Sequence, residues 1–283
     1  MRLLHSARWL LLALLLSLIP ASSYAGVFIS VGFAPPVLPV YEQPPCPDPG
    51  LIWTPGYWAY GDDGYYWVPG AWVPAPYYGA YWTPPYWGWD DGLYVFHPGY
   101  WGPQVGYYGG VNYGFGYFGI GFVGGMWRDH DFYYNRAVWR VDDRRIHHVY
   151  EDRHDWDHHF VERNSRVAYS GGPGGIRHAP DAQERMAMHE QHLGRTSFQA
   201  QHMEAAMHNR NSYARFNGGR PSELVSRQPL GREMHQGPNG MRQADQRNGN
   251  RQMQQFNRGN ENRQMQQPRA KDGRFVSRRQ GDA

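Results

Sequence analysis

The stretch Trp53-Thr-Pro-Gly-Tyr-Trp58 and its near copy Trp67-Val-Pro-Gly-Ala-Trp72 decide the fold of this chain. Two further copies follow, Trp82-Thr-Pro-Pro-Tyr-Trp87 and Phe96-His-Pro-Gly-Tyr-Trp101. The copies start 14, 15 and 14 residues apart, which is an internal period and not an accident of composition. The candidate site residues are the ring and turn positions of these copies: Trp53, Pro55, Gly56, Trp58, Trp67, Pro69, Gly70, Trp72, Trp82, Trp87, Phe96, Pro98, Gly99 and Trp101.

Each copy predicts a turn. Proline presets φ near −65° and glycine accepts positive φ, so Pro-Gly suits the two central positions of a type II turn. The two tryptophans of one copy would then pair across strands. Gly61-Asp-Asp-Gly64 and Asp90-Asp-Gly92 predict a second kind of turn between copies. We expect short antiparallel strands with two turns per repeat; the alternative is loose turns with stacked rings, because tight hairpins prefer other turn types.

The composition excludes an ordinary aliphatic core. The chain of 283 residues holds 35 Gly, 22 Pro, 21 Tyr and 12 Trp, and its apolar surface therefore comes mainly from large rings on a glycine and proline backbone. Such a chain stacks rings locally. We predict a mainly β, irregular aromatic Gly-Pro repeat region of short antiparallel hairpins, followed by a small α-helical hairpin and a disordered polar C-terminal tail.

Shifts in composition divide the chain into seven segments. These are a signal peptide (1–25), a Pro-rich spacer (26–50), the W-x-P-G-x-W repeat region (51–104), a Gly/aromatic segment (105–127), a His/Asp-rich strand-and-loop segment (128–175), a helical hairpin (176–217) and a disordered Gln/Asn/Arg-rich tail (218–283).

The first segment has the layout of a secretory signal. Arg2 and Arg8 precede an apolar core, and Ala25 ends a small-residue cleavage site. The apolar core is too short to cross a bilayer interior of ~30 Å. We expect export to the periplasm, the outer membrane or the outside of the cell, and no transmembrane segment in the mature chain.

The only cysteine, Cys46, follows Pro44 and Pro45 and precedes Pro47. We expect it to lie exposed in a stiff extended spacer. No intramolecular disulfide can form, which leaves a free thiol or an intermolecular bridge.

Residues 105–125 carry no charge and nine glycines, which make a poor helix. We expect a Gly-aromatic strand pair packed on the repeats; membrane spanning, peripheral membrane contact and self-association are the alternatives. Two capping-box spacings, Asp181 to Glu184 and Thr196 to Gln199, predict a helical hairpin over about 181–210. Thirteen basic and six acidic residues from Arg220 onward make the tail basic.

Two groups of side chains could bind metal. Imidazole suits Zn²⁺, Cu²⁺ or Ni²⁺, but the histidines of the His/Asp segment match no defined ligand spacing. We expect a solvated polar segment here, and metal binding is the alternative for these candidates: His147, His148, His154, His158 and His159. We expect a second group to serve helix packing, and Cu(I) binding is the alternative for it: Met186, Met188, His189, His192, His202, Met203, Met207 and His208.

The motif Trp53-x-x-Gly56-x-Trp58 and its copy from Trp67 to Trp72 resemble the repeats of the secreted YXWGXW (WXXGXW) repeat proteins of Gram-negative bacteria. The third copy departs from the pattern at Pro85, and the fourth at Phe96. The resemblance implies export and an envelope setting, and it supplies no catalytic residues.

We therefore predict an exported structural or interaction protein of the cell envelope that is not an enzyme and uses no cofactor. Its expected partners are envelope polysaccharide, lipopolysaccharide or further copies of itself, and not nucleic acid. The alternative is a glycan-binding module with exposed tryptophan and tyrosine rings, and a third hypothesis is a His/Met metal-binding protein. Ring exposure separates the first two hypotheses.

Overall fold

The computed structural model describes residues 29–153, 156–161 and 165–231; the predicted signal peptide lies outside these ranges. The described chain is mostly β, with many short antiparallel strand pairs and few helices, as predicted. Its elements are β1 (Ser30–Val31), β2 (Leu51–Thr54), β3 (Tyr57–Gly61), β4 (Gly64–Val68), β5 (Ala71–Pro74), β6 (Tyr81–Thr83), β7 (Tyr86–Asp90), β8 (Leu93–His97), β9 (Tyr100–Gly102), β10 (Asn112–Gly114), β11 (Tyr117–Phe118), β12 (Gly125–Arg128), β13 (Asp131–Asn135), β14 (Val149–Tyr150), α2 (Trp156–His159), β15 (Tyr169–Ser170), α3 (Ala182–His189), α4 (Ser197–His208), a 3-10 turn η1 (Arg210–Ser212) and α5 (Ala214–Asn217).

The first two motif copies together form one long hairpin. β2 pairs with β5 and β3 pairs with β4, and the acidic loop 62–63 reverses the chain. The register sets Trp53 opposite Trp72 and Trp58 opposite Trp67. Their ring centroids lie 5.3 Å and 5.2 Å apart in edge-to-face geometry, the arrangement that aromatic quadrupoles favour.

The third and fourth copies repeat this arrangement. β6 pairs with β9 and β7 with β8, which sets Trp82 opposite Trp101 and Trp87 opposite Phe96. Both residues of the loop 91–92 have positive φ, 42° and 86°. Two positive φ angles are the mark of a type I′ turn, whose twist matches the paired strands.

The predicted turn at each Pro-Gly pair is wrong. Residues 55–56 and 69–70 lie between the two strand pairs of the first hairpin, so the chain turns once for every two copies. The glycines Gly56, Gly70 and Gly99 do not adopt the positive φ that a type II turn requires. Proline removes a ladder donor here without reversing the chain. The tryptophan pairs therefore join neighbouring copies, and not the two rings of one copy.

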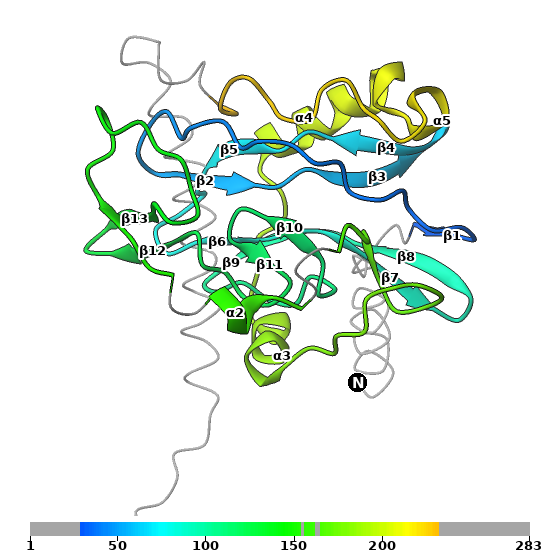
Figure 1. The fold of residues 1–283 in the computed structure, drawn as a ribbon, viewed down its shortest axis with the longest axis horizontal. Coiled ribbons are helices and arrows are strands. Elements are labelled where there is room, and N and C mark those ends of the chain that lie inside the picture. Colours follow the sequence, from blue (N-terminus) through cyan, green and yellow to red (C-terminus); the bar gives the residue numbers. More distant parts are fainter. Residues whose placement is uncertain (1–28, 154–155, 162–164, 232–283) are drawn as a thin grey trace, which may run out of the picture.

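The two repeat hairpins lie in separate layers that face each other (Figure 1). Trp87 of the second hairpin donates its indole N–H to the Trp58 carbonyl of the first over 2.8 Å. β1 and β15 extend the second hairpin to a four-stranded sheet with the order β1-β8-β7-β15. The shared interior of the two layers is consequently filled by indole and phenol rings.

The Gly/aromatic segment packs on the repeats, as expected. β10 and β11 form an antiparallel pair. The buried Tyr113 donates its hydroxyl to Pro85 O, and the buried Tyr117 donates to Trp53 O. The segment therefore touches both repeat hairpins. In the described part of the chain, the helices are too short or too polar to cross a bilayer.

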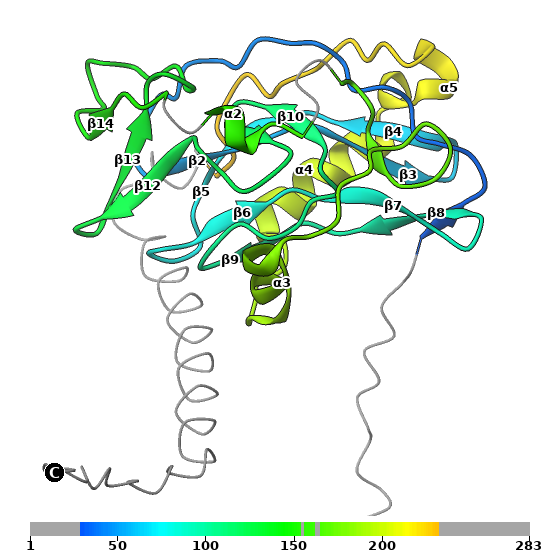
Figure 2. The ribbon, with the colours of Figure 1, turned by 60° about the horizontal axis from the view of Figure 1, so that its bottom comes forward.

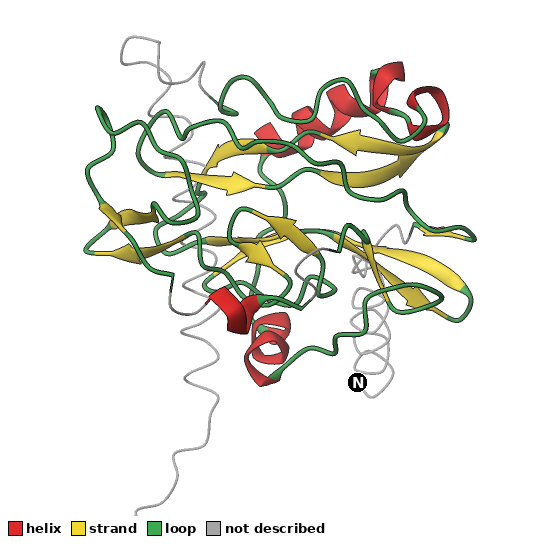
Figure 3. Cartoon of the chain, in the orientation of Figure 1, coloured by secondary structure: helices red, strands yellow, loops and turns green. Residues whose placement is uncertain are grey.

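Both predicted helices are present, with reciprocal capping boxes at Asp181 and Thr196. They do not pack on each other as the predicted hairpin. α4 packs on β4, whereas α3 lies on the outer side of the opposite layer (Figures 1 and 2). The chain between them pairs with β9, where Leu193 and Trp101 exchange backbone hydrogen bonds of 2.8 and 2.9 Å. This pairing separates the two helices (Figure 3).

The Pro-rich segment is extended, and one side of it packs on the core. Val37 O accepts the indole N–H of Trp58, and Pro44 O accepts that of Trp72. The expected exposure of Cys46 is wrong, since its exposed fraction is 0%. An extended proline chain offers free carbonyls and a flat apolar surface, and here the tryptophans use both.

The boundary of the predicted tail also needs correction. Residues 218–231 pack on the first hairpin, where Leu224 O accepts both the Gly70 amide and the Trp67 indole at 3.1 Å. The remainder of the tail, residues 232–283, lies outside the described residues.

Candidate functional site: the tryptophan core and an acidic cavity

The tryptophans of the four copies form the interior of the protein. Each is at most 2% exposed: Trp53, Trp58, Trp67, Trp72, Trp82, Trp87 and Trp101. A ring that stacks on a sugar must present a face to solvent, and these rings present none. The seven repeat tryptophans therefore build the core, and ring exposure favours the structural hypothesis over the glycan platform.

The glycine of the motif has a packing reason. A Cβ on Gly56 would lie 2.3 Å from Cζ2 of Trp67, and a Cβ on Gly70 would lie 2.7 Å from Cζ2 of Trp53. Each glycine is thus covered by the first tryptophan of the facing copy. The pattern W-x-x-G-x-W describes two reciprocal ring-on-glycine contacts in one hairpin.

The second hairpin keeps one of these contacts and alters the other. A Cβ on Gly99 would lie 2.5 Å from Cζ2 of Trp82. Pro85 and Phe96 occupy the register positions equivalent to the other glycine and its covering tryptophan. The larger Pro85 thus stands in place of glycine, and the smaller ring of Phe96 stands in place of tryptophan. The two departures from the motif thus fall at positions whose equivalents, Gly56 and Trp67, contact each other in the first hairpin.

Proline interrupts the backbone hydrogen-bond ladders of the repeat hairpins at Pro55, Pro69 and Pro98. Backbone groups near these positions are left without a ladder partner, and other segments bind them. The Gly56 amide donates to the Tyr41 hydroxyl over 3.2 Å, and burial raises the pKa of Tyr41. His202 of α4 donates Nε2–H to Pro69 O over 2.8 Å. Burial lowers the pKa of His202, so the ring is held neutral. The interruptions are therefore anchor points for the flanking chain.

The described part of the chain does not bring the candidate metal ligands of the His/Asp segment together. In the described ranges no three His, Cys, Asp or Glu side chains lie together as ligands would, and His154 falls outside those ranges. His147 and His148 are exposed beside β14, and His148 stacks on Tyr133. His158 is exposed, whereas His159 bonds through Nδ1 to Ile120 O. The histidines lie on separate elements: His147 and His148 precede β14, and His158 and His159 belong to α2.

The methionine and histidine group on the helices is also dispersed. His192 stacks on Tyr100 with centroids 4.0 Å apart, and His202 is bound to the first hairpin. The side chains of Met186 and Met188 are 59% and 44% exposed. These contacts give the group no common centre.

A cavity of about 470 Å³ lies where α3 begins, beside β12 and β13. It is lined by segments far apart in the sequence, which explains why the sequence did not reveal it. The lining residues are Tyr81, Gln104, Val105, Ile120, Gly121, Phe122, Val123, Gly125, Met126, Asn135, Tyr150, Asp152, His159, Asp181, Gln183 and Glu184.

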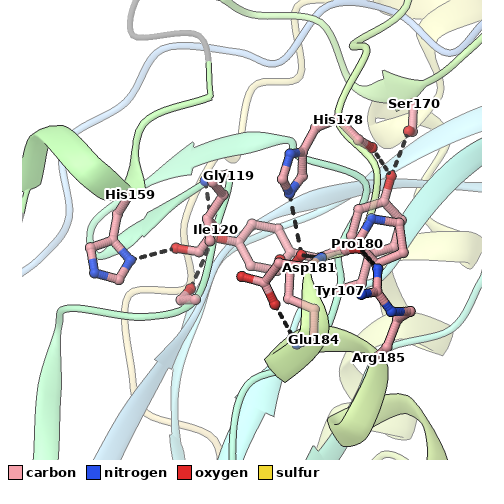
Figure 4. A network of polar contacts seen from close by, with 12 residues as sticks. Tyr107, Gly119, Ile120, His159, Ser170, His178, Pro180, Asp181, Glu184 and Arg185 are labelled. Atoms are coloured by element: carbon pink, nitrogen blue, oxygen red, sulfur yellow. Dashed lines mark hydrogen bonds and ion pairs between the residues drawn. The ribbon is translucent and has the colours of Figure 1, made fainter.

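Glu184 is the most buried charged group at this cavity, with an exposed fraction of 2%. Its Oε2 accepts the Asp181 amide at 2.9 Å and lies 3.2 Å from His178 Nε2 (Figure 4). Burial raises the pKa of Glu184, and the Asp181 hydrogen bond and His178 offset part of the shift. Sequence spacing identified Glu184 only as a member of a capping box; its neighbour His178 gave no signal.

Cys46 is not a usable nucleophile in the folded chain. Its thiol donates to Asp48 O over 3.3 Å, and burial raises the pKa of the thiol to about 12. The thiolate, which is the reactive form, is therefore scarce at neutral pH, and an intermolecular bridge would require the chain to open.

Comparison with known proteins supports the repeat motif. No curated protein and no solved structure shows a significant match to this chain. The WXXGXW repeat matches residues 49–73 in two copies, which covers the first hairpin. The structure gives the third and fourth copies the same pairing. Residues 49–73 are therefore similar to the WXXGXW repeat, and in this hairpin the glycines and tryptophans of the motif cover one another in the core.

Proposed function

We propose that this protein is an exported structural or interaction protein of the cell envelope without catalytic activity. The observation that carries the proposal is the burial of the seven repeat tryptophans, which makes the repeats the internal scaffold of a folded unit. The export part of the proposal rests on residues 1–25, whose charged start, apolar core and cleavage site are typical of a secretory signal.

The indole N–H groups support the scaffold role. They bind the Pro-rich segment at Val37 and Pro44, the C-terminal segment at Leu224, and α4 at Gln199. Through these hydrogen bonds the repeats hold in place chain segments that have little secondary structure of their own. With a single cysteine the chain cannot form an intramolecular disulfide, so the packing of the rings must stabilise it after export.

Contacts with a partner must then use the outer surface. Phe33, Val37 and Val40 expose 57%, 55% and 75% of their area along the Pro-rich segment. Apolar side chains that follow one another in this way are a feature of interaction surfaces. The arginine-rich sequence from Arg220 onward adds positive charge that suits anionic envelope polymers.

Two measurements test the proposal. Fractionation of cells that make the full chain, with mass spectrometry of its N-terminus, should find a mature protein outside the cytoplasm that begins at Gly26. A cytoplasmic, uncleaved chain would contradict export.

Sedimentation tests the interaction part of the proposal. The mature chain should co-sediment with lipopolysaccharide or envelope polysaccharide, or should self-associate when it is alone. The substitutions Val37→Asp and Val40→Asp should reduce this association. A mature chain that stays monomeric and unbound under all three conditions would contradict the interaction role.

A further inference from the structure

The cavity at the start of α3 has an acidic lining. Three carboxylates line it, those of Asp152, Asp181 and Glu184. Among the described residues that form its wall there is no arginine or lysine, and His159 is the one side chain there that protonation would make positive. The cavity therefore favours a positively charged occupant over an anion.

Glu184 supplies an independent sign of a missing ligand. The capping box and His178 use Oε2, and they leave Oε1 buried without a hydrogen-bond partner among the described residues. A buried carboxylate oxygen without a donor is unfavourable. The capping function does not explain this oxygen, because a capping box needs only one acceptor from the residue in this position.

The remaining wall is suited to an organic molecule. Tyr81, Phe122 and Tyr150 contribute rings, and Gln104 and Gln183 contribute amides. Aromatic rings attract ammonium groups through their negative faces, and amides bind hydroxyl or amine groups. A volume of about 470 Å³ lies in the ordinary range for small-molecule sites.

We propose that this cavity binds a small organic molecule with a primary ammonium group, which donates to Glu184 Oε1 and lies beside the Asp181 carboxylate. The carbon skeleton of the ligand packs against Tyr81 and Phe122. An amino sugar and an aliphatic diamine both carry the required group. This binding is separate from the scaffold role of the tryptophans.

Calorimetric titration of the mature chain with glucosamine, 1,4-diaminobutane and glucose tests the proposal. Glucose is the neutral match for glucosamine. Binding of either amine without binding of glucose supports the proposal, and the amine that binds identifies the source. Failure of both amines to bind at millimolar concentration, or equal binding of glucose and glucosamine, overturns it.

Variants at Glu184 and Gln183 locate the site. Glu184→Gln removes the charge and keeps an amide oxygen for the Asp181 N–H, and it should weaken amine binding at least about tenfold. Gln183 is an exposed α3 residue at the cavity, so changes there should not affect folding. Gln183→Lys should weaken amine binding and Gln183→Glu should strengthen it, each by several-fold. Equal affinity in these two variants would overturn the proposal even if Glu184→Gln fails to fold.

Discussion

Replacing Gly56 with alanine tests whether the motif glycine is needed for ring packing. The new Cβ would lie 2.3 Å from Cζ2 and 2.8 Å from Cε2 of Trp67, and 3.0 Å from the Gly70 amide nitrogen. Ordinary contacts begin near 3.4 Å, so the indole or the strand must move by about 1 Å. Trp67 is 1% exposed and cannot swing outward without opening the core.

Overpacking of this kind costs about 1–3 kcal/mol in the free energy of unfolding. For a chain of this size each kcal/mol lowers the melting temperature by roughly 2–4 °C. Thermal and urea unfolding followed by circular dichroism would measure both. Gly194→Ala is the matched control, because a Cβ there meets no atom within 4 Å and the residue lacks positive φ. It should leave stability unchanged or slightly higher.

Trp67→Phe should partly rescue Gly56→Ala, because the second hairpin tolerates Pro85 where Phe96 is the covering ring. In a double-mutant cycle the two changes should cost less together than their sum, by at least about 0.5 kcal/mol. Additive costs, or a Gly56→Ala variant as stable as the Gly194→Ala control, would refute the packing explanation of the motif.

Three further predictions concern other parts of the core. Cys46 should react with a thiol reagent such as DTNB only after unfolding, because burial raises its pKa to about 12; fast reaction in the native chain would contradict this. His202 has a pKa lowered by burial, so the unfolded chain takes up its proton first. Its contribution to stability should be complete above pH 6.5 and fall as the pH drops below it, and His202→Gln should flatten this dependence in urea titrations. Truncation before Leu224 removes the acceptor of the Trp67 indole and should shift tryptophan emission to the red; an unchanged spectrum would contradict the packing of residues 218–231.

The repeats and the acidic turns could be predicted from sequence, but their pairing could not. Pro-Gly and Asp-Gly stretches both indicate turns. Within the two repeat hairpins the chain reverses at residues 62–63 and 91–92, where positive φ or a two-residue loop matches the strand twist. A usable signal was that the two departures from the motif, Pro85 and Phe96, fall in neighbouring copies at positions equivalent to Gly56 and Trp67.

The flanks were predicted less well, for a physical reason. Prolines around Cys46 suggested an exposed spacer, yet one side of the extended chain packs on the core, where Trp58 and Trp72 donate to its carbonyls. Contacts of this kind depend on residues distant in sequence and leave no local pattern. The same holds for the cavity, whose wall joins β6, β12 and α3.

Iodide quenching of tryptophan fluorescence in the mature chain, from Gly26 to Ala283, tests the central claim most directly. The claim is that the repeat tryptophans form the core. It predicts blue-shifted emission that iodide quenches weakly and that envelope polysaccharides and lipopolysaccharide leave unchanged. Red-shifted emission that iodide quenches strongly and that a polysaccharide protects would contradict the claim and make the repeats a carbohydrate-binding surface.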